Sequence, residues 1–176
     1  MSSEATILYE TEDIQAAVRR LASELDDNLG QEPLLISVLN ESILFLADLV
    51  RSVERPIRYE FIQVVYSAEG DDEEILKIQY PIPFDLEGAD VILVRDLSTT
   101  GVIESYLAPQ FLEHGARRVR VAALLDIPER RTTDFETDFR ALSAPPGTGT
   151  VVGYGMKHEG RHGNLPHIAQ LPATTP

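Results

Sequence analysis

Residues 91–103 read VILVRDLSTTGVI, and this stretch decides the fold because its character changes twice over a short distance. Residues 91–94 form a continuous apolar run, which is typical of a strand buried on both faces and therefore of a parallel sheet. The polar residues 95–101 follow as an expected loop, and a helix is expected over residues 102–114. A strand, a loop and a helix in this order predict one unit of an α/β domain.

Further strands and helices are expected on both sides of this stretch. Apolar or β-rich runs predict strands over residues 5–9, 34–39, 57–66, 75–80, 119–126 and 151–154. Helical spacing of apolar residues predicts helices over residues 14–25 and 43–53. Strands that alternate with helices predict a single α/β domain, residues 1–176, with a mainly parallel central sheet flanked by helices.

The ends of these elements carry local signals. Thr11 is the expected N-cap of the first helix, and Gly30 marks the expected exit from it. Pro109 lies inside the expected third helix, where a proline costs about 3 kcal/mol, so a kink or a break is expected there. The tail, residues 170–176, is expected to be frayed, and the acidic run 69–74 (EGDDEE) is expected to be a solvated loop.

Charge and composition exclude several classes of protein. The chain of 176 residues carries 15 basic and 29 acidic side chains, which give a formal net charge of −14. Binding to nucleic acid or to anionic lipid needs a surplus of Lys and Arg, so neither partner is expected. The chain has no cysteine, which excludes disulfides and thiolate metal sites. The first residues do not resemble a signal peptide, and we expect a cytoplasmic protein without a membrane span.

Ligands of parallel α/β sheets bind beyond the carboxyl ends of the strands. Four of the expected loops lie at that edge, after Leu39, Tyr66, Val94 and Asp126. The loop after Val94 is the most informative, because it combines charged and hydroxyl side chains and then opens a helix. The N–H groups at a helix N-terminus favour a phosphate.

Residues 91–103 also have the form of a phosphoribosyltransferase signature, with an apolar strand, acidic positions and a Thr-Gly pair that opens a helix. The segments ILYETEDIQ, LLISVLN, LADLV, YEFIQV, LLDIPERR, VVGYGM and NLPHIAQL follow in an order that closely resembles hypoxanthine-guanine phosphoribosyltransferase over residues 7–171. The resemblance implies the type I phosphoribosyltransferase fold, including a small hood subregion. It implies transfer of 5-phosphoribosyl from phosphoribosyl pyrophosphate to hypoxanthine or guanine, the reaction of purine salvage.

The resemblance can be carried over to the signature residue by residue. Ser98, Thr100 and Gly101 fall where the family's loop binds the 5′-phosphate. Asp96 matches one of two neighbouring carboxylates that hold the ribose hydroxyls. Arg95 replaces the other carboxylate with a cation.

Two positions that the family uses toward the purine also differ. Thr99 stands at the general-base position, and a threonine hydroxyl cannot accept a proton usefully at neutral pH. Ile127 replaces the lysine that recognises the purine 6-oxo group, which makes this part of the base pocket apolar. A transferase that acts on a different acceptor is therefore one alternative.

The positions that the family uses for pyrophosphate and metal differ in part. Asn40 and Glu41 occupy the pyrophosphate loop, and Arg161 matches an arginine that contacts pyrophosphate. Lys157 replaces a magnesium-binding aspartate. Arg95 and Lys157 thus place positive charge where carboxylates would hold Mg²⁺, and a cation cannot ligate that ion. We expect no metal, and Mg²⁺ only if the protein is an active transferase.

These replacements favour a catalytically degenerate homologue that binds a purine nucleotide, phosphoribosyl pyrophosphate or another phosphorylated ligand. The alternatives are an active purine phosphoribosyltransferase and one with a different acceptor. The resemblance also implies a homodimer or homotetramer, and a mixed oligomer with an active relative is a further alternative. The apolar helix expected over residues 43–53 suits such an interface.

Some of these residues have plainer interpretations. Arg95 and Asp96 could form only a surface ion pair. Thr99 and Thr100 could serve only as the cap of the following helix. His158 and His162 are spaced for a metal site, but the glycines around them favour a loop.

Overall fold

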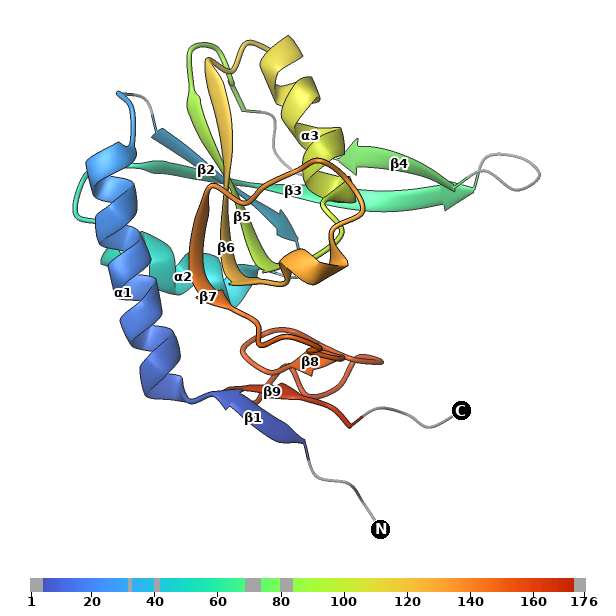
Figure 1. Ribbon diagram of the computed structural model, residues 1–176. Coiled ribbons are helices and arrows are strands. Elements are labelled where there is room, and N and C mark those ends of the chain that lie inside the picture. The colour runs from blue at the N-terminus through green and yellow to red at the C-terminus, as the bar shows by residue number, and fades with distance from the viewer. Residues whose placement is uncertain (1–4, 32, 40–41, 69–73, 80–83, 173–176) are drawn as a thin grey trace.

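The computed structural model describes residues 5–31, 33–39, 42–68, 74–79 and 84–172, with the backbone alone described at residues 65–68 and 74–77. It contains a six-stranded sheet and a separate three-stranded sheet (Figure 1). The strands are β1 (Thr6–Tyr9), β2 (Pro33–Leu39), β3 (Arg58–Ala68), β4 (Glu74–Gln79), β5 (Asp90–Ser98), β6 (Arg118–Asp126), β7 (Phe139–Ser143), β8 (Val151–Val152) and β9 (Ile168–Gln170). The helices are α1 (Thr11–Asn28), α2 (Ile43–Ser52), α3 (Val102–Glu113) and the short 3-10 helix η1 (Pro128–Arg130).

The larger sheet has the strand order β4-β3-β2-β5-β6-β7. From β3 to β7 every neighbouring pair in this order is parallel, and β4 runs antiparallel to β3 at the edge. The expected mainly parallel central sheet is therefore confirmed. Its parallel strands all end at one edge, which places the loops that follow them together.

β5 shows why the central strands are continuously apolar in sequence. Ile92 and Val94 belong to the buried cluster that packs with α1 and α2, whereas Val91 and Leu93 belong to the cluster that packs with α3. Successive side chains of a strand point to opposite faces, so both faces of β5 are covered by helices (Figure 1). A strand with two covered faces needs apolar residues at every position.

Two strands are longer than the sequence predicts. β5 continues to Ser98, because Arg95, Leu97 and Ser98 still pair with residues of β6. Only residues 99–101 then remain as a turn, instead of the expected loop over 95–101. β3 likewise runs beyond Tyr66 to Ala68. The expected acidic loop at 69–74 lies almost wholly outside the described residues.

The helix ends also differ from the prediction. The N-cap of α1 is Glu10 and not Thr11, and the Glu10 N–H donates to Asp13 Oδ2 over 3.3 Å. Of the kink or break expected at Pro109, a break is wrong, because α3 is continuous through the proline. Leu107 and Phe111 on either side of the proline are fully buried against the sheet, and this packing holds both halves of the helix.

The smaller sheet has the order β1-β9-β8 and lies below the carboxyl ends of the parallel strands in Figure 1. It is the hood subregion that the resemblance implied. Strands β7 and β9 have no counterpart in the prediction. The tail is ordered further than expected, since Gln170 pairs with β1 and β8, and the Leu171 N–H donates to the Thr150 carbonyl over 2.8 Å. Among the described residues, none of the helices is long and apolar enough to cross a membrane.

Candidate functional site

The turn at residues 99–101 joins the end of β5 to the start of α3. Gly101 is the N-cap of α3 and has φ +78°, a left-handed conformation that glycine adopts without steric cost. A Cβ at this position would lie 2.4 Å from Thr133 Oγ1, so the close approach of a neighbouring segment also requires glycine. The Thr100 hydroxyl accepts a long hydrogen bond of 3.4 Å from the Val102 N–H, so Thr100 does act as part of the cap.

The carbonyl groups of this turn are held by the segment between β6 and β7. Arg131 Nη1 donates to the Thr99 carbonyl over 2.7 Å. The Thr100 carbonyl accepts the Thr132 N–H over 3.0 Å and the Thr133 hydroxyl over 3.2 Å. In a trans peptide the C=O and N–H bonds point to opposite sides. The N–H groups of Thr100 and Gly101 therefore point away from this segment, at the positive end of the α3 dipole, where an anion is stabilised.

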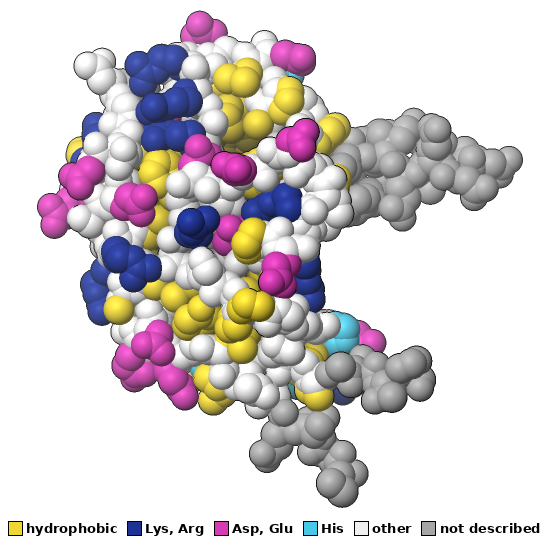
Figure 2. Space-filling model, viewed as in Figure 1, with side chains coloured by type: hydrophobic (Ala, Val, Ile, Leu, Met, Phe, Trp, Pro, Cys, Tyr) yellow, Lys and Arg dark blue, Asp and Glu magenta, His cyan; other side chains and the backbone are white. Residues whose placement is uncertain are grey.

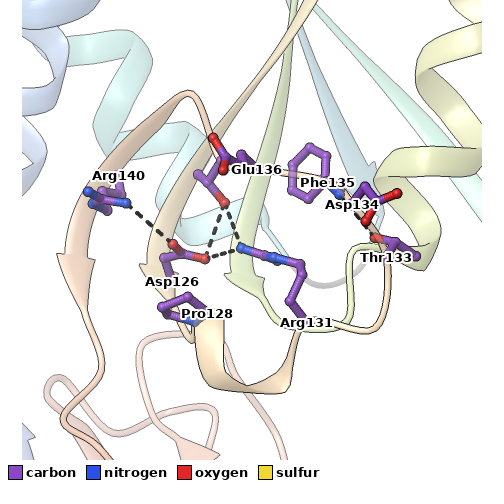
Figure 3. A pocket seen from close by; sticks show the side chains of 9 residues that line it. Asp126, Pro128, Arg131, Thr133, Asp134, Phe135, Glu136 and Arg140 are labelled. Atoms are coloured by element: carbon purple, nitrogen blue, oxygen red, sulfur yellow. Dashed lines mark hydrogen bonds and ion pairs between the residues drawn. The ribbon is translucent and has the colours of Figure 1, made fainter.

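A buried polar network lies behind the turn (Figure 3). Arg131 donates to Ser98 Oγ over 2.9 Å and to Asp126 Oδ1 over 2.7 Å. The Thr137 hydroxyl is 3.1 Å from both of these acceptors. The structure therefore commits the hydroxyl of Ser98, a residue expected at the phosphate, to this network, and Ser98 is 0% exposed.

An open cavity of about 590 Å³ lies beside this network, and Arg131 and Thr137 of the network line it. Figure 3 shows Asp126 at its centre between Arg131 and Arg140. Arg140 Nη1 is 3.7 Å from Asp126 Oδ2, and the Arg131 guanidinium lies 5.0 Å from the ring centroid of Phe135. Asp126 thus forms ion pairs with two arginines and accepts a hydrogen bond from Arg131.

Arg95 does not form the surface ion pair with Asp96 that the plainer interpretation suggested. Its Nε lies 3.0 Å from Glu104 Oε1, and the two side chains are only 8% and 3% exposed. Burial of a charge is costly without an opposite charge close by, and Glu104 supplies that charge from the first turn of α3. The cation that replaces a family carboxylate is therefore compensated inside the protein.

Asp96 is also buried and lies toward α2. Its backbone N–H donates to Ser42 Oγ over 3.1 Å, and its carboxylate accepts the Leu97 N–H over 2.7 Å. Ser42 caps α2 and follows the expected pyrophosphate loop. Asn40 and Glu41 of that loop lie outside the described residues.

The remaining expected residues lie under or in the hood. Ile127 is 2% exposed and belongs to the same buried cluster as Met156 of the hood. Lys157 and Arg161 are exposed on a tight turn after β8. Among the described residues there is no cluster of three or more acidic, His or Cys side chains suited to a metal, so His158 gains no support as a metal ligand.

Tyr154 connects this turn to α2. It has φ +50°, and its hydroxyl donates to the Asp48 carboxylate. Burial, with the Asp48 carboxylate as hydrogen-bond acceptor and negative neighbour, raises the pKa of Tyr154 well above its usual value of 10.0. Asp48 also pairs with the exposed Arg51, which lies three positions further along α2.

The parallel sheet, the Thr-Gly turn that opens α3 and the hood at the carboxyl edge together define a phosphoribosyltransferase of the type I fold. A family model, the phosphoribosyl transferase domain, matches residues 4–158. Taken with the relatives that follow, this match shows that the chain belongs to the hypoxanthine-guanine phosphoribosyltransferase family.

Three relatives illustrate the similarity. The hypoxanthine-guanine phosphoribosyltransferase of Streptococcus pneumoniae is 32% identical over 94% of this chain and 92% of its own length. That of Bacillus subtilis is 31% identical with the same coverage. A crystal structure of a hypoxanthine-guanine phosphoribosyltransferase from Bacillus anthracis has a TM-score of 0.84 at 30% identity, and the match covers 97% of this chain and 100% of that chain.

Proposed function

We propose that the protein binds the 5′-phosphate of a purine nucleotide or of phosphoribosyl pyrophosphate at the turn 99–101. The observation that carries this proposal is the orientation of the turn. Hydrogen bonds from Arg131 and Thr132 hold the Thr99 and Thr100 carbonyls on one side, so the next two N–H groups face the other side at the N-terminus of α3. This binding depends on the backbone and not on the replaced side chains.

We propose further that transfer of the phosphoribosyl group is slow or absent. In the family reaction the bond from ribose C1 to pyrophosphate breaks and a bond to purine N9 forms, while a base removes a proton from the purine. Thr99 stands where the resemblance places that base. Loss of a general base typically slows a reaction by about 10²–10⁴-fold, which corresponds to roughly 3–5 kcal/mol of activation free energy.

The resemblance implies Mg²⁺ bound together with pyrophosphate, but the side chains present do not fit a metal held by the protein. Mg²⁺ needs oxygen donors in near-octahedral geometry. Arg95 and Lys157 supply nitrogen cations at two of the relevant positions, and Asp96 alone keeps a carboxylate. Because Arg95 is neutralised by Glu104, Lys157 and Arg161 are the exposed cations that we propose for a pyrophosphate or second phosphate group.

The second candidate is an active transferase of hypoxanthine or guanine, with the role of the missing base taken by another group. It is favoured by the match to a hypoxanthine-guanine phosphoribosyltransferase over 94% of this chain at 32% identity. A third candidate, altered acceptor specificity, rests on Ile127, whose buried side chain would line the floor of an apolar base pocket. The replacements at Thr99 and Lys157 are not explained by a new acceptor, so we prefer the first candidate.

The assembly that we propose is a homodimer or homotetramer in the cytoplasm, formed through α2 and β3. Ile43 and Leu44 are 41% and 46% exposed, and Tyr59 on β3 is 52% exposed. Exposed large apolar side chains such as these are the kind that an interface buries. A mixed oligomer with an active relative would give a degenerate subunit a regulatory role. We expect no nucleic-acid partner, given the net charge of −14.

The test combines an activity assay with ligand binding on the purified protein. Phosphoribosyl pyrophosphate, Mg²⁺ and hypoxanthine or guanine are supplied, and formation of IMP or GMP is followed. In parallel, the thermal unfolding midpoint is measured with IMP, GMP or phosphoribosyl pyrophosphate, each with and without Mg²⁺. We expect stabilisation without Mg²⁺, about 2.7 kcal/mol at a hundredfold excess over the dissociation constant, and little turnover. Robust turnover supports the active transferase, and stabilisation that strictly needs Mg²⁺ contradicts binding without metal.

A further inference from the structure

We propose that Arg131 is a positioning residue that fixes the phosphate-binding turn without touching the ligand. This inference rests on the proposed phosphate site at residues 99–101. Arg131 follows η1, far from the turn in sequence, yet its guanidinium reaches the Thr99 carbonyl over 2.7 Å. The same side chain reaches Ser98 Oγ and Asp126 Oδ1, which lie at the ends of β5 and β6. One planar group therefore joins two strand ends and the turn; Figure 3 shows its contact with Asp126.

The chemistry of the network requires an arginine. Nη1 serves Ser98 and Thr99 at once, and Nη2 serves Asp126 over 2.7 Å and Thr137 over 3.3 Å. Two nitrogens in a fixed plane can hold these acceptors together, whereas a lysine has one nitrogen on a flexible chain. The guanidinium also lies against the ring of Phe135, which restricts its orientation.

The charge of Arg131 is already compensated. Asp126 is 2% exposed and lies at hydrogen-bond distance, so the pair has little net charge to offer a phosphate. Arg131 instead fixes the orientation of the peptide between Thr99 and Thr100. While the Thr99 carbonyl is bound, the N–H of Thr100 is held toward the opposite side. Without that bond the peptide can rotate, and binding of a phosphate must then include the free-energy cost of ordering it.

The test compares Arg131→Met and Arg131→Lys with Arg140→Gln as the matched control. Arg140 lines the same cavity and pairs with the same Asp126, and this ion pair does not involve the turn. Affinities for GMP and for guanosine are measured by calorimetry, because their ratio isolates the contribution of the 5′-phosphate. Hydrogen exchange of a peptide covering residues 98–103 is measured without ligand.

We expect both Arg131 variants to bind GMP about tenfold more weakly or worse, which corresponds to about 1.4 kcal/mol of binding free energy. Their affinity for guanosine is expected to be unchanged. The Thr100 carbonyl keeps its bonds to Thr132 and Thr133, which limits the loss. Exchange in the turn is expected to rise in both variants, and Arg140→Gln is expected to match the unmodified protein. Arg131→Lys keeps a charge opposite Asp126 and so serves if Arg131→Met does not fold.

Two results overturn the inference while the phosphate site stands. One is GMP binding by Arg131→Lys that equals the unmodified protein, since lysine keeps the charge but not the planar fork. The other is an equal loss of affinity for GMP and for guanosine together with a lower unfolding temperature, which shows that Arg131 contributes to stability alone. If the unmodified protein binds GMP no more tightly than guanosine, the proposed phosphate site fails, and this inference fails with it.

Discussion

The guanidinium of Arg95 on β5 and the carboxylate of Glu104 on α3 form a buried ion pair, with 3.0 Å between Nε and Oε1. Arg95 directly follows the apolar run 91–94. Glu104 lies on the helix face that also carries the buried Leu107 and Phe111. Each of the two buried charges compensates the other, so neither is left unpaired in the core. The pair also links the first turn of α3 to β5, on either side of the turn 99–101 in the sequence.

Glu104→Ala is expected to destabilise the protein by about 3–5 kcal/mol, because it removes the carboxylate that compensates a buried cation. Urea unfolding followed by circular dichroism gives the free energy of unfolding. The double variant Arg95→Met, Glu104→Leu replaces both charges with apolar groups of similar size and is expected to recover most of the loss. A double variant that is as unstable as Glu104→Ala would contradict the compensation argument.

Asp90 at the start of β5 is expected to make the protein sensitive to acid. The carboxylate is 0% exposed and accepts two hydrogen bonds from Arg118 and one of 2.6 Å from the Gly30 N–H. Burial alone raises the pKa of Asp90, but the bonds from Arg118 and Gly30, together with the charges of Arg120 and Arg118, hold the pKa below the ordinary value. Lys and Arg side chains gather over this end of the sheet in Figure 2.

The sign of the effect follows from this lowered pKa. The stabilisation is fully present above the pKa of Asp in the unfolded chain, about 3.9, and is lost as the pH falls through the lower folded value. Urea unfolding between about pH 7 and pH 2 should show this loss. Asp90→Asn is expected to lower stability at neutral pH and to flatten its dependence on acid pH. Asp27→Asn, at an exposed residue, serves as the control, and its free energy of unfolding should depend on pH as in the unmodified protein.

Gly101→Ala is expected to harm the phosphate site for two separable reasons. The residue has φ +78°, and a new Cβ would lie 2.4 Å from Thr133 Oγ1 and 3.0 Å from Phe135 Cβ. Gly147→Ala is the matched control, because Gly147 has φ +74° but no atom within 4 Å of the added Cβ. The control should lose about 1 kcal/mol of unfolding free energy from backbone strain. Gly101→Ala should lose more, together with GMP affinity, and equal losses in the two variants would show that the close approach of Thr133 is unimportant.

Tyr154→Phe tests the link between the hood and α2. Removing the hydroxyl leaves Asp48 without the Tyr154 bond, and a loss of about 1–2 kcal/mol is expected. The raised pKa of Tyr154 means that this stabilisation is present below the pKa of an unfolded tyrosine, about 10, and is lost as the pH rises above it. Unfolding midpoints measured at alkaline pH should therefore fall less steeply in Tyr154→Phe. Tyr59→Phe, on a half-exposed residue, is the control and should behave like the unmodified protein.

Much of the fold could be predicted from local pattern. The continuous apolar runs of β2, β5 and β6 require two covered faces, and this requirement implies a parallel sheet with helices on both sides. β7 could not be found in this way, because only Phe139 and Ala141 of its five residues are buried. Its strand conformation comes from pairing with β6, for example Phe139 with Ala122, and sequence alone does not show that pairing. Pro109 misled the prediction for a similar reason, since packing of α3 outweighs a local preference.

The position of the candidate site could be predicted from the sequence more easily than the hydrogen bonds and ion pairs that hold it. Thr100 and Gly101 were identified because a turn before a helix has a local signature. Arg131 was present in the segment LLDIPERR, but nothing near it in sequence shows that its guanidinium reaches Ser98, which is 33 positions away. The pairing of Glu104 with Arg95 could have been predicted from the sequence. A charged residue at a helix position that continues to the apolar Leu107 and Phe111 needs a buried partner, and Arg95 was the unexplained cation of the preceding strand.

The double variant Thr99→Asp, Lys157→Asp tests whether the rest of the pocket is intact. Thr99→Asp returns a carboxylate to the position of the general base, and Lys157→Asp replaces a cation with an oxygen donor at the hood. If the proposed degeneracy is correct, the rate of IMP or GMP formation should rise by about 10²–10⁴-fold and should become dependent on Mg²⁺. Thr99→Asn with Lys157→Asn is the matched control, since asparagine has nearly the shape of aspartate but accepts no proton at neutral pH. A rise in the control as well would point to a change in pocket shape, and no rise in either would show that the loss of activity lies elsewhere in the cleft.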